Sequence, residues 1–316
     1  MAWYAVRRLL LLVPTLVGMS VLIFAMVRLL PGDVVDAMFT GDAGATAGAK
    51  QAVRQALGLA DPLPVQYLRF AGGIVTGALG QSLTSGEPVA KIMARAIPIT
   101  VELAVVAAAT ATVVGIPLGV LSAVRPHTAL DFAARVGGLI GLSVPSFWFA
   151  TLALLATSVF LHWIPPVTWI PPWQDLPGNL LQMAIPALAI AVYLAATVMR
   201  MTRASMLEVL LQDYIRTARA KGVPGRAVMF RHALRNSLIP VITVIGFQVG
   251  TLIGGATIVE VIFGLPGMGY TLVQGIFTRD YTVIEVAALF LAAVFVIINL
   301  LVDLLYGVLD PRIEQA

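Results

Sequence analysis

Six long apolar segments constrain the fold of this chain more than any other feature of its sequence. Each is about as long as the roughly 20 residues that a helix needs to cross the hydrocarbon core of a bilayer. Inside lipid the backbone N–H and C=O groups find no water, so such segments fold as helices. We expect an all-α membrane protein whose six spans lie near residues 9–29, 98–122, 132–160, 180–199, 238–262 and 283–305.

The composition supports this class and excludes several others. Hydrophobic residues make up 59% of the chain and charged residues 11%, whereas soluble domains carry roughly 25% charged residues. The absence of cysteine excludes disulfides, thiolate metal sites and cysteine nucleophiles. The net charge of +4 is spread over separate loops, unlike the basic patch of a nucleic-acid-binding protein. The first apolar run is too long for a signal peptide and lacks a small-residue cleavage site, so we interpret it as a retained span.

Prolines and glycines inside these segments are compatible with helical spans. In a helix bundle, neighbouring helices and local bends can satisfy the carbonyls freed by Pro14, Pro117, Pro145 and Pro186. Small residues at helical spacing allow two helices to approach closely. The glycines with such spacing are Gly137, Gly138, Gly141, Gly246, Gly250, Gly254 and Gly255.

The distribution of lysine and arginine predicts the orientation in the membrane, because these residues favour the cytoplasmic side. With a cytoplasmic N-terminus, the inner segments together hold 13 Lys or Arg in 67 residues, and the outer segments hold six in 107. We therefore predict that both termini are cytoplasmic. The inner segments are residues 1–8, 123–135, 200–237 and 309–316, and the outer ones are residues 31–97, 161–180 and 263–282.

One inner segment contains the longest strongly polar run of the chain, residues 213–240. Six basic residues in it face a single acid, Asp213. Asp213 is a suitable N-cap and Gly222 a suitable residue just beyond the C-terminus, so the pattern predicts a short helix over 214–221. Such a helix is only about 12 Å long and cannot bury a core of its own. We interpret it as a docking element for another protein, and Pro224 as the start of a second helix leading into the membrane.

This polar run carries a family resemblance. Residues 213–222, read DYIRTARAKG and followed by His232, Asn236 and Pro240, resemble the cytoplasmic signature loop of ABC-importer permeases. In the general motif E-A-A, three residues, G, Ala218 matches the second alanine and Gly222 the glycine. Arg and Thr occupy the first two places, as in the dipeptide, oligopeptide and nickel permease group of the DppB/OppB type.

Further motifs extend the resemblance over nearly the whole chain. Residues 31–33, 80–83 and 309–312 match the pattern of this group near the first span and at the end of the last span. Outer residues 31–97 have helix-compatible apolar spacing over 43–57 and 65–79, too little for an independent domain. The last outer loop is similar to the group's outer gate, with a short re-entrant helix over 272–277. Its matching residues are Pro266, Gly267, Gly269, Arg279 and Asp280.

The resemblance implies a fold, a function and a set of partners. It implies the six-helix fold of type I ABC-importer permeases, with a first span in 1–30, a helical extracytoplasmic cap in 31–97, and a core permease domain in 98–316 that holds the coupling loop 203–237. It implies import of di- or oligopeptides, with a second homologous permease, two ATPase subunits or one fused ATPase, and an extracytoplasmic binding protein. The residues implied to couple with the ATPase are Asp213, Tyr214, Arg216, Thr217, Ala218, Arg219, Ala220, Lys221 and Gly222.

The sequence predicts no catalytic, ATP or metal site of its own. It contains no GxxxxGK[ST] loop, so the resemblance places ATP and Mg²⁺ on the partner ATPases and makes this chain a transport subunit, not an enzyme. His127, His162 and His232 are scattered without an HExxH motif. Ser143 beside Pro145 lacks an identifiable basic partner for an intramembrane protease.

Ionisable residues inside spans are candidates for the translocation path, because each costs at least roughly 2.5 kcal/mol at mid-membrane. Glu260, Glu285 and Asp303 lie near span ends, where we expect their carboxylates to reach water. Glu102 suits a role as partner of an arginine or of a helix-end amide. Tryptophans of the loop 161–180 are expected to anchor the membrane interface. The residues proposed for the path are Glu102, Ser143, Pro145, Ser146 and Glu260.

Two alternatives remain open at this point. One is a standalone secondary transporter or channel, which would suit six spans that carry intramembrane acids, although the sequence lacks the ladder of acids typical of ion-coupled transport. The other is the same importer type serving nickel or glutathione. Serines 143 and 146 can equally be helix-packing residues around Pro145.

Overall fold

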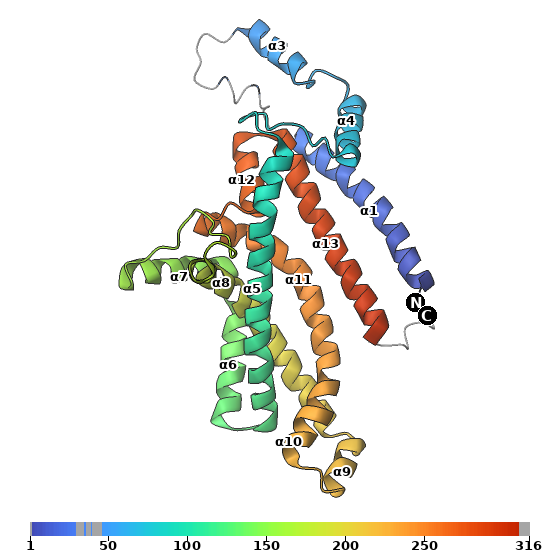
Figure 1. Ribbon diagram of the computed structural model, residues 1–316, viewed down its shortest axis with the longest axis vertical. Helices are drawn as coiled ribbons and strands as arrows, with labels where there is room; N and C mark the ends of the chain where they lie inside the picture. Colours follow the sequence, from blue (N-terminus) through green and yellow to red (C-terminus); the bar gives the residue numbers. More distant parts are fainter. Residues whose placement is uncertain (1, 30–34, 36–38, 40–45, 310–316) are drawn as a thin grey trace. The chain divides into compact units, whose positions relative to one another are not determined.

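The computed structural model describes residues 2–29, 35, 39 and 46–309, and these are organised almost entirely as helices (Figure 1). Within them the only β-type pairing is an isolated bridge between Gln81 and Pro88. The elements are α1 Ala2–Leu29, α3 Ala47–Ala56, α4 Leu63–Thr76, α5 Val89–Val124, α6 Ala129–Ser143, α7 Ser146–Phe160, α8 Leu176–Leu210, α9 Asp213–Ala220, α10 Gly225–Ala227, the π-helix η1 Val228–Leu234, α11 Arg235–Phe263, α12 Met268–Thr278 and α13 Tyr281–Leu309.

Five described helices are long and apolar enough to cross a membrane. They cover Leu10–Leu29, Val89–Val124, Leu176–Leu210, Gly225–Leu252 and Tyr281–Val302, and two bent helix pairs raise the count to seven if each pair is one span. Five of the six predicted segments each lie within one helix, namely α1, α5, α8, α11 or α13. The helices expected over 43–57 and 65–79 correspond to α3 over Ala47–Ala56 and α4 over Leu63–Thr76, and residues 43–45 lie outside the described part of the chain.

The sixth predicted segment, residues 132–160, is not one continuous helix. It consists of α6 and α7, whose axes differ by 102° across a short break. The cause is Pro145, which has no N–H to continue the helix and pushes the preceding residue out of the helical region. Val144 accordingly adopts φ −87° and ψ 120°, and Pro145 becomes the N-cap of α7. Pro14 and Pro186, by contrast, lie inside unbroken helices.

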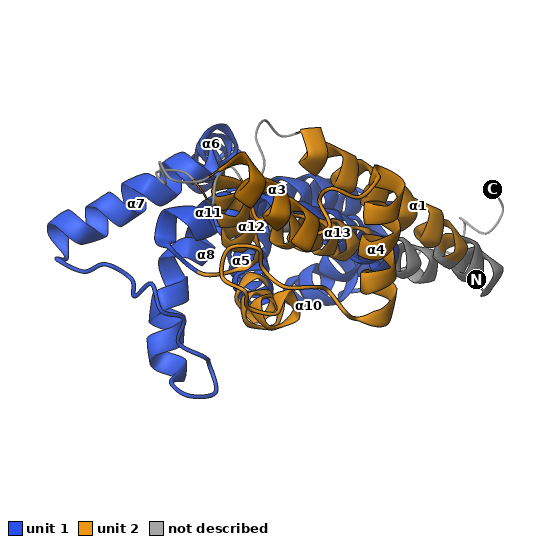
Figure 2. Cartoon of the chain, turned by 90° about the horizontal axis from the view of Figure 1, so that it is seen from above, with its two compact units in different colours: residues 1, 101–265, 297–316 blue, residues 2–100, 266–296 orange. Residues whose placement is uncertain are grey.

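The chain divides into two compact units, coloured separately in Figure 2. Unit 2 comprises residues 2–100 and 266–296. Its core joins the start of α5 to α12 and the start of α13. The buried residues of this core are Val89, Met93, Ala96, Met268, Val283, Val286 and Ala287.

Unit 1 comprises residues 101–265 and 297–316, with α8 as its most buried helix. Two glycines of α5 allow close contact with α8: a Cβ at Gly115 would lie 2.8 Å from Ala195 O, and one at Gly119 2.6 Å from Met199 O. Because backbone atoms occupy that space, only glycine fits at these crossings. The sequence analysis did not single out this pair, although its Gly-x-x-x-Gly spacing is the known signal for close packing.

The glycines predicted to pack closely against other helices differ in the space around them. Gly138 and Gly141 of α6 face side chains of α8, and Gly246 faces Val302 within the same unit, as expected. A Cβ at Gly137, Gly254 or Gly255 would meet no atom within 4 Å. The close packing expected at those three positions is therefore absent from the described part of the chain.

Candidate coupling and translocation sites

The short helix α9 forms where the polar run predicted it, one residue earlier at each end. Its N-cap is Gln212, with extended backbone at φ −68° and ψ 147°, so the predicted capping role of Asp213 is wrong. Asp213 is instead the first helical residue, and its carboxylate is 96% exposed and 3.5 Å from the Arg216 guanidinium. An acid in the first turn still interacts favourably with the helix dipole.

The C-terminal end of α9 confirms the prediction made for Gly222. Gly222 adopts φ +76°, its N–H donates to Arg219 O at 3.0 Å, and Val223 N–H donates to Ala218 O at 3.2 Å. This pair of bonds is a Schellman motif, in which a left-handed residue just after the helix satisfies its last carbonyls. The chain therefore turns sharply after Lys221, and α9 has a fixed end.

A single buried side chain holds α9 against the rest of unit 1. Ile215 is fully buried in a cluster with residues of α5, α8 and η1, namely Val120, Ala123, Met206, Val228 and Ala233. A second tether is the hydrogen bond from Asn236 Nδ2 to the Tyr214 hydroxyl at 2.8 Å. Ile215 is not among the predicted coupling residues, although it is the one large aliphatic residue among the polar side chains of the helix.

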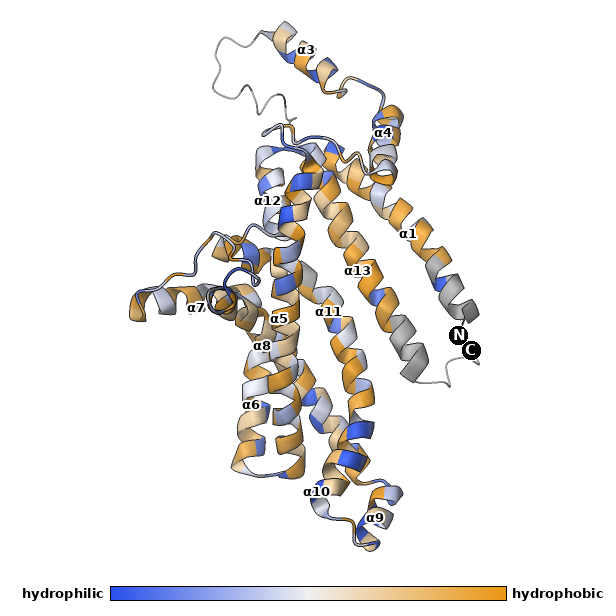
Figure 3. Cartoon of the chain, in the orientation of Figure 1, coloured by the Kyte–Doolittle hydropathy of each residue, from blue (hydrophilic) through white to orange (hydrophobic). Residues whose placement is uncertain are grey.

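The remaining face of α9 is presented to the outside. The predicted coupling residues are exposed, except Ala218, which is half-buried against the Ile215 cluster. Figure 3 shows hydrophilic residues concentrated in α9 and at the beginning of α11, in contrast to the apolar spans. A short polar helix with one buried anchor and a free outer face is a geometry suited to docking.

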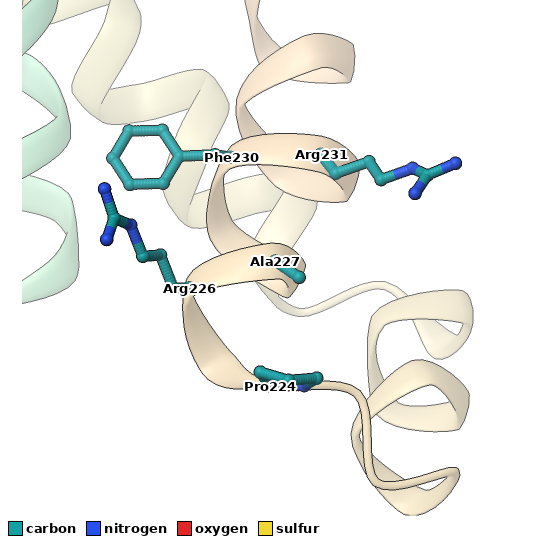
Figure 4. Close-up of a pocket in the computed structure, with 5 residues that line it drawn as sticks. All are labelled: Pro224, Arg226, Ala227, Phe230 and Arg231. Carbon is teal, nitrogen blue, oxygen red and sulfur yellow. The ribbon is translucent and has the colours of Figure 1, made fainter.

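A groove lies along α10 and η1, the two elements that follow α9 in the chain. It has a volume of 520 Å³ and is lined by Pro224, Arg226, Ala227, Phe230 and Arg231. Figure 4 shows Arg226 and Phe230 side by side on one side of the backbone and Arg231 on the opposite side. Pro224 is the N-cap of α10, so the predicted helix start after the loop is found there.

A buried charge cluster joins α5, α6 and α8 in unit 1. Asp131, which is fully buried, accepts hydrogen bonds from Ser122 Oγ at 2.6 Å and from the His127 N–H at 3.0 Å. Arg203 of α8 donates Nε and Nη2 to the two carboxylate oxygens at 2.8 and 3.2 Å. The sequence alone does not predict this pair, because Asp131 and Arg203 lie in different inner segments, 123–135 and 200–237.

The carboxylate of Glu102 is bound by one group of the loop that precedes α8 and by one group of α8 itself. It accepts hydrogen bonds from Trp169 Nε1 at 2.8 Å and from Asn179 Nδ2 at 2.5 Å. Glu102 thus has bonded partners, as expected, but they are an indole N–H and a side-chain amide instead of an arginine or a helix-end amide. Trp169 therefore has an intramolecular partner, while Trp173 is 72% exposed as an interfacial anchor would be.

Two acids expected to reach water are instead buried. Glu260 of α11 is fully buried, and Glu285 of α13 is 5% exposed. Glu285 accepts a hydrogen bond from Arg28 Nη1 at 2.6 Å within unit 2, and Arg28 Nε donates to Gln66. A paired partner compensates for burial of a charge, which is why Glu285 needs no route to solvent. The side chain of Asp303 lies outside the described residues.

Three of the proposed path residues meet at one cavity. Ser143, Pro145 and Ser146, at the break between α6 and α7, line a cavity of 320 Å³ together with Ile190 and Tyr193 of α8 and Thr251 of α11. Glu102 and Glu260 do not line this cavity. The Ser143 hydroxyl donates to Leu139 O at 2.8 Å, a bond within its own helix.

The predicted outer-gate residues cluster around α12 in unit 2. Asp280, almost fully buried, accepts hydrogen bonds from the hydroxyls of Ser82 and Thr84 at 2.5 and 3.0 Å. Gly267 is the N-cap of α12, and Arg279 ends it at φ +57°. The short helix expected over 272–277 is thus present and longer, and Asp280 ties its end to the loop that carries Ser82.

Comparison with known proteins identifies the family. The family described as "Binding-protein-dependent transport system inner membrane component" matches residues 115–315, and its N-terminal component matches residues 1–104. The oligopeptide transport system permease protein AppB of Bacillus subtilis is 39% identical over 99% of this chain and 100% of its own length. The dipeptide transport system permease protein DppB of Escherichia coli is 40% identical over 100% of this chain and 99% of its own length.

Solved structures agree on the fold. A methionine ABC transporter in an inward-facing conformation matches with a TM-score of 0.57 at 19% identity, covering 71% of this chain and 99% of its own. An amino acid ABC transporter matches with a TM-score of 0.54 at 15% identity, covering 68% and 93%. The chain belongs to the inner-membrane components of binding-protein-dependent transport systems and, within them, to ABC permeases of the DppB/OppB type. It is a multi-pass membrane protein and the permease component of its system.

Proposed function

We propose that this chain is the transmembrane subunit of an ATP-driven, binding-protein-dependent importer of di- or oligopeptides. Relatives of nearly equal length that carry dipeptide or oligopeptide transport names support the substrate class. The observation that carries the proposal is α9, a two-turn polar helix closed by Gly222, with Ile215 as its one fully buried side chain. A helix held in this way is accessible to a partner and connected directly to the spans.

The proposed topology has six spans, with both termini in the cytoplasm. A first span in residues 1–30 is followed by an extracytoplasmic cap in 31–97, which contains α3 and α4, and by the core permease in 98–316. The bent pair of α6 and α7 then acts as one broken span. Helix α12 acts as the re-entrant element of the outer gate, held by Asp280.

The proposed mechanism transmits motion from two partner ATPase subunits, or one fused ATPase, which bind ATP and Mg²⁺. Helix α9 docks on an ATPase, and Ile215 passes its displacement to α5, α8 and η1, which share one buried cluster. ATP binding then shifts a two-state equilibrium between inward-open and outward-open arrangements. A second homologous permease completes the path, and an extracytoplasmic binding protein delivers the peptide.

The cavity at the α6–α7 break is the proposed part of the path within this chain. It offers the hydroxyls of Ser143, Ser146, Tyr193 and Thr251 in a mostly apolar wall. Hydroxyl groups donate and accept hydrogen bonds, so they can serve the amide groups of a peptide without selecting its side chains. Glu102 and Glu260 act on the path by positioning helices, given their bonded or buried state.

The experiment places a bulky residue on the docking face of α9. Ala220→Trp is preferable to Ala218→Trp, because Ala220 is exposed and Ala218 packs inside the chain. In the reconstituted complex, we expect Ala220→Trp to lower peptide uptake at least tenfold and to uncouple it from ATP hydrolysis. Ala129→Trp, at another exposed alanine outside α9, is the matched control. Normal uptake by Ala220→Trp would refute the docking role.

The alternatives are separated by two further measurements. Transport by this chain reconstituted alone would favour a secondary transporter or channel over an ATP-driven subunit. Identification of the molecule bound to the co-purified binding protein decides between a peptide, glutathione and nickel, because such systems place much of their selectivity on that partner.

A further inference from the structure

Gly255 has no reason within the described part of the chain to be a glycine. It lies in the interior of α11, where glycine is less favourable than alanine because its backbone loses more freedom on folding. Its φ is not positive, so no left-handed turn requires it. A Cβ at this position would meet no atom within 4 Å, so no close helix contact requires it either. A reason for glycine therefore has to come from something that occupies the space beside it.

That space belongs to the cavity at the break between α6 and α7. Gly255 lines this cavity together with Thr251 and Leu252, which precede it by about one turn on the same face of α11. Among the residues that line the cavity, Gly255 is the one without a side chain. Gly137 and Gly254, where an added Cβ would also meet no atom, do not line it. Of these three glycines, only Gly255 therefore affects the width of the cavity.

The wall of the cavity offers neutral hydrogen-bonding groups and no charge. The side chains of Ser146, which is half-buried, and Tyr193, which is 46% exposed, form no hydrogen bond with the part of the chain that the structure describes. No charged side chain lines the cavity. A molecule in this space can be hydrogen-bonded by hydroxyl groups, and its fit is limited by size and shape instead of charge.

We infer that Gly255 keeps this passage open and sets the size of the largest substrate side chain that can move through it. The inference rests on the proposed function, in which the cavity is part of the peptide path, and it adds a determinant of specificity to that path. The absent side chain leaves room for a bulky apolar group of the peptide beside Thr251 and Leu252. A side chain at position 255 would occupy that room, so large substrates would be excluded first and small ones would still pass.

Close packing against the second permease is the other explanation for a glycine with empty space around it. Gly254 fits that explanation better, because it is exposed and does not line the cavity, whereas Gly255 is half-buried in the cavity wall. The two neighbours thus form a matched pair. They are the same residue type in the same helix, and they differ in whether they border the cavity.

The first measurement is competitive uptake of alanyl-alanine and phenylalanyl-phenylalanine by the reconstituted complex with its binding protein. The same binding protein delivers both peptides to every variant, so its own preference cancels when each variant is compared with the wild type. Gly255→Leu should lower the ratio of the larger to the smaller peptide about tenfold or more, because small volume changes in an apolar pocket already discriminate at that level. Gly255→Ala should lower the ratio less, and Gly254→Leu should keep the wild-type ratio.

Two results of this measurement would overturn the proposal. One is an unchanged ratio in Gly255→Leu, and the other is an equal fall in the uptake of both peptides, which would indicate a packing role. Gly255→Ala guards against misfolding, since its added methyl group meets no atom within 4 Å.

The second measurement does not depend on the identity of the substrate. The chain contains no cysteine, so Gly255→Cys and Gly254→Cys each introduce a single thiol into this subunit. A cationic methanethiosulfonate reacts with the thiolate, which forms in water and not in hydrocarbon. It should modify Gly255→Cys in membranes much faster than Gly254→Cys, and equal rates would overturn the proposal. If the wild-type complex takes up neither peptide while Gly255→Cys is still modified selectively, the peptide substrate of the proposed function is refuted, and Gly255 is supported as the wall of an open passage.

Discussion

Arg203 on α8 donates from Nε to Asp131 Oδ1 at 2.8 Å, and this contact connects two helices through a fully buried carboxylate. A charge inside a protein is tolerated only when it is paired and its remaining lone pairs are bonded. Ser122 and the His127 N–H supply those bonds. The cluster therefore fixes the ends of α5 and α6 on α8, a short distance along the chain from α9.

Replacing Asp131 with alanine should destabilise the protein strongly. Removing one partner of a buried pair costs about 3–5 kcal/mol, because the other charge is left uncompensated. We expect a marked fall in the thermal unfolding temperature of the purified complex. Arg135→Gln is the control, since Arg135 is half-exposed and 3.5 Å from the same carboxylate. An unchanged unfolding temperature for Asp131→Ala would contradict the structural role of the cluster.

Gly119→Ala should separate α5 from α8. The added Cβ would lie 2.6 Å from Met199 O and 2.6 Å from Thr202 Cβ, so backbone has to move. Overpacking of this kind costs about 1–3 kcal/mol. At Gly137, where no atom lies within 4 Å of the added carbon, alanine should be neutral or stabilising because it favours helix. Thermal unfolding of the two variants is compared. Equal unfolding temperatures for Gly119→Ala and Gly137→Ala would refute the close contact between α5 and α8 at Gly119.

Gly222→Ala should loosen the end of α9 and impair coupling. An L-residue at φ +76° is strained by about 1–2 kcal/mol, although the space around Gly222 is open. Asparagine tolerates this conformation better, so Gly222→Asn should be milder. Gly225→Ala, in equally open space without a positive φ, is the control. The readout is the ratio of peptide uptake to ATP hydrolysis. This ratio should be lowered by Gly222→Asn and lowered further by Gly222→Ala, while Gly225→Ala keeps the normal ratio.

The stability of the protein should depend on pH through Glu87, which precedes α5. The hydrogen bond from Arg95, followed by interactions with Lys91, lowers the pKa of this carboxyl below its ordinary value. A lowered folded-state pKa contributes stability above the unfolded pKa, and this contribution disappears as pH falls through the folded value. Glu87→Gln should therefore lower the unfolding temperature slightly at neutral pH and not in strong acid. A constant difference across this range would exclude the ionic contribution.

Local rules predicted much of the fold and part of the candidate sites. The positions of the long helices follow from apolar segment length, and the turn at Gly222 follows from the need for a left-handed residue after a helix. The features that were not predicted depend on contacts between residues that are distant in the sequence. Asp131 meets Arg203 across 72 positions, and Ile215 is buried only because α5, α8 and η1 surround it. Pro145 is recognisable in the sequence as a possible helix break. The 102° angle between α6 and α7 depends instead on how each of these helices packs against the rest of the chain.

The π-helix η1, between the loop and α11, gives this connection a property that an ordinary α-helix lacks. Seven consecutive residues, Val228–Leu234, are wound with a wider turn than α11 itself. If one residue were taken up by a return to α-helical winding, the preceding loop would swivel by about 100° around the axis of α11. A change of winding in η1 would therefore rotate α9 about the axis of α11 without altering α11 itself.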